Sequence, residues 1–194
     1  MNLITVKSNG EFFYMTPDTS LNRDSKDYFC PEFVEEFAVV CFCYVRIEKN
    51  AKAVAERYAE RYISGFGYGI KLKALNLRGE FNPYKDFMTS ALDNTTYISP
   101  CLRQDDFASI QPSLTIDGNH IEKVDCKTVE RVINDYPKAI ANITSVSTLR
   151  SGDIIIFETD FYNTQKAYLK RDKSNTQAES SKISFGEIDV TVYW

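Results

Sequence analysis

The pattern of apolar and polar positions predicts a chain rich in β-strands. The longest apolar run lies within Phe33–Ile47, where AVVCFCYVRI shows almost no alternation before Arg46. A continuous run of this length predicts a strand that is buried on both faces. A second strand is predicted over Tyr68–Leu77, where larger apolar residues alternate with glycine and lysine. In such a strand Lys71 and Lys73 share one face.

Shorter apolar segments predict further strands, each bounded by turn residues. One of these segments contains an Asp-Gly pair, which indicates a hairpin turn, and the segment at the end of the chain is divided by a glycine into two strands. The predicted strands are Phe12–Met15, the hairpin Leu114–Ile121 around Asp117-Gly118, Ile154–Phe157, and Ile183–Trp194 around Gly186.

Two segments have helical spacing of apolar residues. The first is expected to begin at an Asn50 cap, to bury Val54, Tyr58 and Tyr62, and to end near Gly65. The second carries an apolar stripe from residue 129 to 140, in which Pro137 is expected to cause a kink or a break. Residues 79–113 are expected to be mostly irregular, and 174–182 to form a flexible polar loop.

Composition narrows the class of protein. The chain has 194 residues, of which 43% are hydrophobic, and a net charge of −4. This length predicts a single domain, and this charge argues against binding to nucleic acid or to an anionic membrane. The first ten residues lack a basic start followed by an apolar run, and no apolar stretch is long enough to span a bilayer. Five cysteines without a Cys-x-x-Cys pair favour a cytoplasmic chain with free thiols.

Several local patterns occur in one order along the chain. They are Phe12–Leu21 (FFYMTPDTSL), Pro31–Ile47, Ala59–Leu77 around Tyr68-Gly69-Ile70, Lys85-Asp86-Phe87 with Ser90-Ala91, Leu114–Ile121, Thr148-Leu149 before Gly152–Ile155, and Gly186-Glu187. In this order and spacing the chain resembles the fumarylacetoacetate hydrolase family, from about residue 12 to residue 194. The chain would then be one family domain, 1–194, truncated at its N-terminus.

The resemblance implies an α+β fold, a mixed β-roll with few helices, that is usually a homodimer. Family members cleave C–C bonds in acylpyruvate-like diketo acids, or decarboxylate or isomerise related 2-oxo acids. They use Mg²⁺ or Mn²⁺ to chelate the oxo acid and to stabilise the enolate that forms.

The chain departs from the family at the implied metal ligands. The positions of the family's Glu-x-Glu pair hold Val40 and Phe42, and the position of its Asp holds Lys71. Apolar side chains cannot bind a divalent cation, and an ammonium group repels one. Glu35 and Glu36 would need a register shift to replace the pair. We therefore expect neither a metal nor another cofactor.

Other positions of the implied pocket are also changed. The family's Arg-Asp pair is Leu75-Asn76 here, and the Asp after the retained Lys85-x-Phe87 pattern is Met88. The family's Thr-Gly-Thr-Pro is Phe157–Asp160, of which Thr159 alone is retained, and His120 is expected on the surface. The expected pocket residues are Val40, Phe42, Lys71, Lys85, Glu158 and Thr159.

Three functions remain open on these residues. The first is a non-catalytic binding or structural subunit, which forms a homodimer or pairs with an active relative. The second is a metal-independent hydrolase, decarboxylase or isomerase, in which Lys71, with Lys85 as a further candidate, forms a Schiff base with a 2-oxo acid. The third is a binder of a small oxo or dicarboxylic acid held by Lys71, Lys85 and Thr159.

Two structural outcomes distinguish these hypotheses. If Lys71 forms a salt bridge with Glu158 or Asp160, its role is structural rather than chemical. If the family interpretation holds, Val40, Phe42 and Lys71 lie together around one cavity. If they are scattered, the chain is an α+β domain of another kind.

Overall fold

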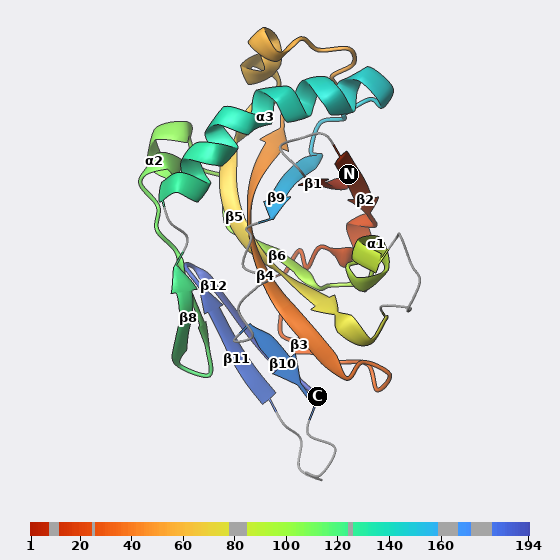
Figure 1. Cartoon of the computed structure of the whole chain (residues 1–194), viewed down its shortest axis with the longest axis vertical. Helices are drawn as coiled ribbons and strands as arrows, with labels where there is room; N and C mark the ends of the chain where they lie inside the picture. Colours follow the sequence, from red (N-terminus) through yellow and green to blue (C-terminus); the bar gives the residue numbers. More distant parts are fainter. Residues whose placement is uncertain (8–11, 25, 78–84, 124–125, 159–166, 172–179) are drawn as a thin grey trace.

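A computed structural model describes residues 1–7, 12–24, 26–77, 85–123, 126–158, 167–171 and 180–194. Two β-sheets and one long helix dominate this part of the chain (Figure 1). The predicted α+β fold with few helices is confirmed, and the described strands form mixed open sheets without closing into a barrel.

The larger sheet has seven strands in the order β2-β1-β9-β4-β5-β6, and β10 pairs with β4 beside this path. The long strand β4 pairs with β5 along one edge, and with β9 and then β10 along the other. Its strands are β1 (Leu3–Lys7), β2 (Phe12–Thr16), β4 (Glu36–Ile47), β5 (Ile63–Ala74), β6 (Thr96–Ile98), β9 (Ile154–Glu158) and β10 (Tyr168–Lys170).

The smaller sheet has five strands in the order β3-β12-β11-β7-β8. Its strands are β3 (Tyr28–Phe29), β7 (Ser113–Ile116), β8 (Asn119–Lys123), β11 (Ser180–Phe185) and β12 (Ile188–Tyr193). The hairpin around Asp117-Gly118 and the strand pair around Gly186 are confirmed as β7–β8 and β11–β12. Both turns need a residue in the left-handed region, which Gly118 (φ 76°) and Gly186 (φ 60°) supply.

The predicted central strand is confirmed. From Phe37 to Val45 every residue of β4 is buried, and Arg46 is the first exposed one. One face of β4 contributes Val39, Cys41, Cys43 and Val45 to the main hydrophobic core. The opposite face carries Phe42 and Tyr44, which belong to a second, smaller apolar cluster. A strand buried on both faces explains why alternation is missing from this segment.

Helix α3 (Cys126–Val146) packs across one end of the larger sheet, together with α2 (Gln104–Ala108) and the 3₁₀ helix η3 (Glu56–Tyr62) (Figure 1). The short helix α1 (Lys85–Thr89) lies near β2 and η4 (Leu75–Leu77), and η2 (Asp18–Ser20) follows β2. No helix in the described ranges is long and apolar enough to cross a membrane.

One prediction about helices is wrong, and the helix break that was one of the two outcomes expected at Pro137 is not found. Asn50 does not cap a helix, because its side-chain oxygen accepts a hydrogen bond from Ser151 N (3.1 Å) and Ala51 forms a β-bridge with Leu149. The segment after Asn50 forms this bridge and then a bend, in which Ala53 has a φ of 51°, and only the 3₁₀ helix η3 follows. Pro137 does not break α3. Burial of Tyr136, Ala139 and Ile140 on both sides of the proline stabilises the helix despite the missing backbone donor.

Several strands also differ from the prediction. Strand β5 begins at Ile63 and ends at Ala74, and β1 was not predicted at all. Residues 79–113 contain α1, β6 and α2 in their described part, so they are less irregular than expected. Residues 172–179 lie outside the described residues, but Ser180–Lys182 belong to β11 and form no loop.

Candidate functional site

The three positions at which the family resemblance implied metal ligands lie side by side. Val40 of β4 pairs directly with Lys71 of β5, and Phe42 pairs with Gly69. On its other edge Phe42 pairs with Glu158, the last residue of β9. Directly opposite residues of antiparallel strands point to the same face. Val40, Phe42, Lys71 and Glu158 therefore share one face of the larger sheet.

Glycine makes this arrangement possible. A Cβ at Gly69 would collide with the Phe42 ring and with the carbonyl oxygen of Tyr97, and one at Gly67 would collide with the Tyr44 ring. The two aromatic rings thus lie over the backbone of β5. The face is densely packed here, and neither of the two described cavities is lined by Val40, Phe42 or Lys71. The cavity expected around these three residues stays a prediction, because residues 159–166, which follow Glu158, lie outside the described residues.

Two lysines and one glutamate form a buried ionic cluster on this face. Lys73 Nζ lies 2.7 Å from Glu158 Oε1 and 2.9 Å from Oε2. Lys71 Nζ lies 3.7 Å from Glu158 Oε1. The lysine side chains are 0% and 1% exposed, and that of Glu158 is 3% exposed. The salt bridge expected between Lys71 and Glu158 is confirmed, although Lys73 makes the shorter contact.

Hydroxyl groups from two other strands complete the cluster. Lys71 Nζ donates to Thr5 Oγ1 (3.1 Å), and the Tyr14 hydroxyl donates to Glu158 Oε1 (3.2 Å). Lys73 Nζ lies 3.5 Å from the Tyr14 hydroxyl, and Lys71 Nζ lies 5.9 Å from the centre of the Tyr14 ring. Thr5 pairs with Tyr14 across β1 and β2, so one backbone register positions both hydroxyls. Buried charges are tolerated when they are paired and hydrogen-bonded in this way.

The cysteines of β4 lie on the opposite face and take no part in the cluster. Cys41 and Cys43 are fully buried in the main core, and they lie on one face because they are two residues apart in the same strand. Burial raises the pKa of the Cys43 thiol to about 12, an effect that Arg131 partly opposes. A thiol that stays protonated at neutral pH is a poor nucleophile.

The side chains at the implied ligand positions do not fit a divalent cation. Val40 and Phe42 have no donor atom, and Lys71 carries a positive charge. Glu35 and Glu36 do not replace them, because the β4–β5 pairing runs without a shift from Phe37 to Arg46. Glu36 is four residues from Val40, which is about 13 Å along a strand. Within the ranges the structure describes, no three His, Cys, Asp or Glu residues are grouped so as to hold a metal ion.

The other predicted pocket residues are only partly placed. Lys85 begins α1, but its side chain lies outside the described residues. Thr159 and Asp160 also lie outside them. His120 is exposed on β8 of the smaller sheet, as expected.

Sequence reasoning missed Lys73, Tyr14 and Thr5 as members of the cluster. The alternation in β5 already places Lys73 on the face of Lys71, and this signal was sufficient to find it. The positions of Tyr14 and Thr5 in the cluster depend on the pairing of β1 with β2 and with β9. Strands β1 and β9 are about 150 residues apart in the sequence. No local pattern in the sequence contains that information.

The sequence of this chain is similar to that of a known protein family. Residues 5–192 match the family model described as fumarylacetoacetate (FAA) hydrolase C-terminal. The chain therefore belongs to the fumarylacetoacetate hydrolase family. No protein of curated function matches it in sequence.

Solved structures of low sequence identity share the fold. A fumarylacetoacetate hydrolase family protein from Yersinia pestis CO92 is 20% identical with a TM-score of 0.69, covering 98% of this chain and 91% of that one. Fumarylpyruvate hydrolase from Pseudomonas aeruginosa, in complex with Mn²⁺ and pyruvate, is 15% identical with a TM-score of 0.71, covering 99% and 89%. An isomerase of 2-hydroxyhepta-2,4-diene-1,7-dioate from Mycobacterium marinum is 16% identical with a TM-score of 0.67, covering 98% and 73%. The family thus includes both hydrolases and isomerases.

Proposed function

We propose that this chain is a fumarylacetoacetate hydrolase-like protein that does not catalyse metal-dependent C–C bond hydrolysis and acts as a non-catalytic binding or structural subunit. The observation that carries this proposal is the ionic cluster of Lys71, Lys73 and Glu158. It occupies the sheet face on which the resemblance implied three carboxylates around a cation.

The electrostatics of the cluster support the proposal. Two ammonium groups share the Glu158 carboxylate at 2.7 and 3.7 Å. A divalent cation brought to this carboxylate would meet both ammonium groups within a few ångströms, in a region where water does not screen the repulsion. The carboxylate is also engaged by the Tyr14 hydroxyl, so a metal would compete with three existing contacts.

Turnover of oxo acids tests the proposal. The purified protein is assayed with oxaloacetate and a panel of acylpyruvates, with Mn²⁺ and then with excess EDTA. The fumarylpyruvate hydrolase from Pseudomonas aeruginosa serves as positive control, and Mn²⁺ in buffer alone gives the background. We expect no rate above background in either condition. Saturable turnover with Mn²⁺ that EDTA abolishes would contradict the proposal.

The alternative enzyme, which uses Lys71 as an amine nucleophile without metal, is less favoured by the geometry. Lys71 is fully buried, and its Nζ is hydrogen-bonded to Thr5 and paired with Glu158. An amine that forms a Schiff base must be reached by the substrate and must lose its proton, and a neighbouring carboxylate opposes that loss. Borohydride reduction in the presence of pyruvate would add mass to the protein, but not to Lys71→Ala, if this alternative were correct.

The subunit role and the location of the protein belong to the same proposal. We propose a homodimer, or a heterodimer with an active relative, in the cytoplasm. Cys30, Cys43 and Cys101 are free thiols, which supports a reducing compartment. Native mass spectrometry at micromolar concentration tests the dimer, and a monomer both alone and with the active relative would count against a structural role in an assembly.

A further inference from the structure

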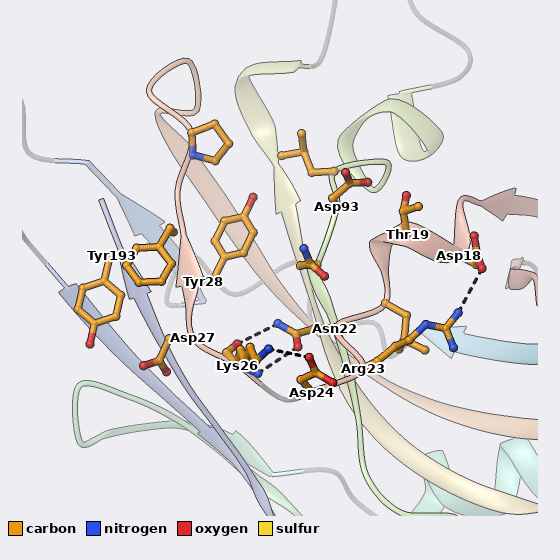
Figure 2. Close-up of a pocket in the computed structure, with 15 residues that line it drawn as sticks. Asp18, Thr19, Asn22, Arg23, Asp24, Lys26, Asp27, Tyr28, Asp93 and Tyr193 are labelled. Atoms are coloured by element: carbon orange, nitrogen blue, oxygen red, sulfur yellow. Dashed lines mark hydrogen bonds and ion pairs between the residues drawn. The ribbon is translucent and has the colours of Figure 1, made fainter.

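A cleft of about 1140 Å³ lies away from the ionic cluster, between two loops (Figure 2). One wall is formed by Asp24 and by the segment that runs from Lys26 through β3 to Pro31, together with Tyr193 of β12. The other wall is formed by Asp18, Thr19 and the turn Leu92–Asn94. No function has been assigned above to any of these residues.

Hydrogen bonds hold both walls in place. Asn94 N donates to the carbonyl of Thr19 (2.9 Å), and Thr95 Oγ1 donates to the carbonyl of Leu92 (2.7 Å). On the other wall, Asn22 exchanges two hydrogen bonds with the Lys26 backbone, at 2.9 and 3.0 Å. The cleft is therefore preformed, which reduces the entropic cost of binding.

The cleft carries an excess of negative charge. Its lining contains four aspartates but only two cations, Arg23 and Lys26. Each cation is already paired with a lining carboxylate: Arg23 with Asp18 (3.2 Å) and Lys26 with Asp24 (2.8 Å). The Asp27 carboxylate accepts one hydrogen bond, from Thr191 N (2.9 Å). Across the part of the chain that the structure describes, no cation is paired with Asp27 or Asp93.

The hydroxyl group of a largely buried tyrosine opens into the same cleft. Tyr28 is 5% exposed, and its ring is fixed edge-on against Phe37 with ring centres 5.6 Å apart. Figure 2 shows its hydroxyl directed toward the side of the cleft where Asp93 lies. Among the described residues, no group is hydrogen-bonded to this hydroxyl. Burial above all raises the pKa of Tyr28, and Asp93 adds to the effect, so the hydroxyl stays neutral. The hydroxyl oxygen is not one of the fully buried, unpartnered atoms of the described residues, so it is open to the cleft.

An exposed aromatic surface adjoins these polar groups. The rings of Phe29 and Tyr193 stack with centres 5.1 Å apart and planes 13° apart, and both line the cleft. Phe29 is 75% exposed, so the outer face of its ring is open to solvent. Such a face attracts alkyl chains and positively charged groups.

We propose that this cleft binds an organic cation whose alkylammonium or guanidinium group lies between the Asp93 carboxylate and the Tyr28 hydroxyl oxygen. The carboxylate neutralises the charge, and the hydroxyl accepts a hydrogen bond from the N–H. Figure 2 places Asp27 on the other side of Tyr28 from Asp93, where it suits a second positive group on the same ligand. The inference is independent of the function proposed for the ionic cluster. The same chemistry is offered by a free polyamine and by a lysine side chain of another protein.

Isothermal titration of the full chain at low ionic strength tests this inference. The probes are spermidine, putrescine and the peptide acetyl-Ala-Lys-Ala-amide, and the controls are the neutral 1,4-butanediol and the anionic glutarate. We expect saturable binding of at least one cation, weakened by added salt, and no binding of either control. Tighter binding of the polyamines would identify a free amine as the ligand, and tighter binding of the peptide would identify a protein segment.

Three variants locate the binding site. Asp93→Asn is expected to weaken binding about tenfold or more, and Tyr28→Phe several-fold, because each removes a hydrogen bond to a charged group. Asp105→Asn, at an exposed aspartate of α2 remote from the cleft, is the matched control and should leave the affinity unchanged. Circular dichroism and melting temperature confirm that each variant is folded. The inference is overturned if none of the cations binds at concentrations up to roughly 10 mM, because a weaker dissociation constant means negligible affinity. It is also overturned if butanediol binds as well as the cations, or if Asp93→Asn binds the cation as tightly as the original protein.

Discussion

Replacement of Glu158 by Gln tests the ionic cluster most sharply. The side chain keeps its shape but loses the charge that Lys73 Nζ approaches at 2.7 Å and Lys71 Nζ at 3.7 Å. All three side chains are 97% or more buried, so water cannot replace the lost partner. Removal of one member of a buried ion pair typically costs about 3–5 kcal/mol, against about 5–15 kcal/mol for the whole stability of a domain. We expect Glu158→Gln to lower the free energy of unfolding by about 4 kcal/mol.

Urea unfolding followed by circular dichroism measures this change. Glu48→Gln, at an exposed glutamate directly after β4, is the matched control and should change stability by less than about 0.5 kcal/mol. The triple variant Glu158→Leu with Lys71→Met and Lys73→Met removes all three charges of the cluster and should recover much of the loss, since apolar replacements of buried ionic groups are often neutral. If Glu158→Gln cost no more than Glu48→Gln, the cluster would not be the buried, mutually dependent unit that the distances indicate.

Three further predictions concern the same region. Gly69→Ala should lower the free energy of unfolding by about 3 kcal/mol, because the added methyl group collides with the Phe42 ring and the Tyr97 carbonyl. Urea unfolding measures this change, and an unchanged stability would refute the close approach of these groups to Gly69. Lys71→Met should cost less than Lys73→Met, since its contact with Glu158 is 1.0 Å longer; the reverse order in the same assay would be inconsistent with the geometry. Burial raises the pKa of Cys43 to about 12 from an ordinary value of 9.0, so its contribution to stability is complete below pH 9 and is lost as the pH rises toward 12. Stability should therefore fall more steeply above pH 9 in the original protein than in Cys43→Ala, and parallel pH profiles would argue against this cause.

The central part of the fold could be predicted because local patterns determine it. The run AVVCFCYVRI gives β4, and alternation gives β5 together with the shared face of Lys71 and Lys73. The hairpin around Asp117-Gly118 follows from turn chemistry that acts over four residues. In each case the segment itself carries the information that decides its structure.

The errors arise where distant segments decide local structure. Asn50 looks like a helix cap, but pairing of Ala51 with Leu149 takes the next residue into a β-bridge instead of a helix. Pro137 looks like a helix break, but burial on both sides outweighs its intrinsic cost. The hydroxyl groups of Thr5 and Tyr14 join the ionic cluster only through the register of β1 with β2 and β9. The cleft beside Tyr28 likewise combines Asp93 with a segment more than 60 residues earlier in the chain.

A crystal structure of this protein grown with Mn²⁺ and pyruvate, analysed by anomalous diffraction at the manganese edge, tests most directly whether the ionic cluster excludes a metal. We expect no manganese peak on the sheet face formed by Val40, Phe42, Lys71 and Glu158, with Lys73 still bound to Glu158. A well-occupied manganese peak coordinated by the Glu158 carboxylate, with Lys71 and Lys73 displaced from it, would contradict the central claim.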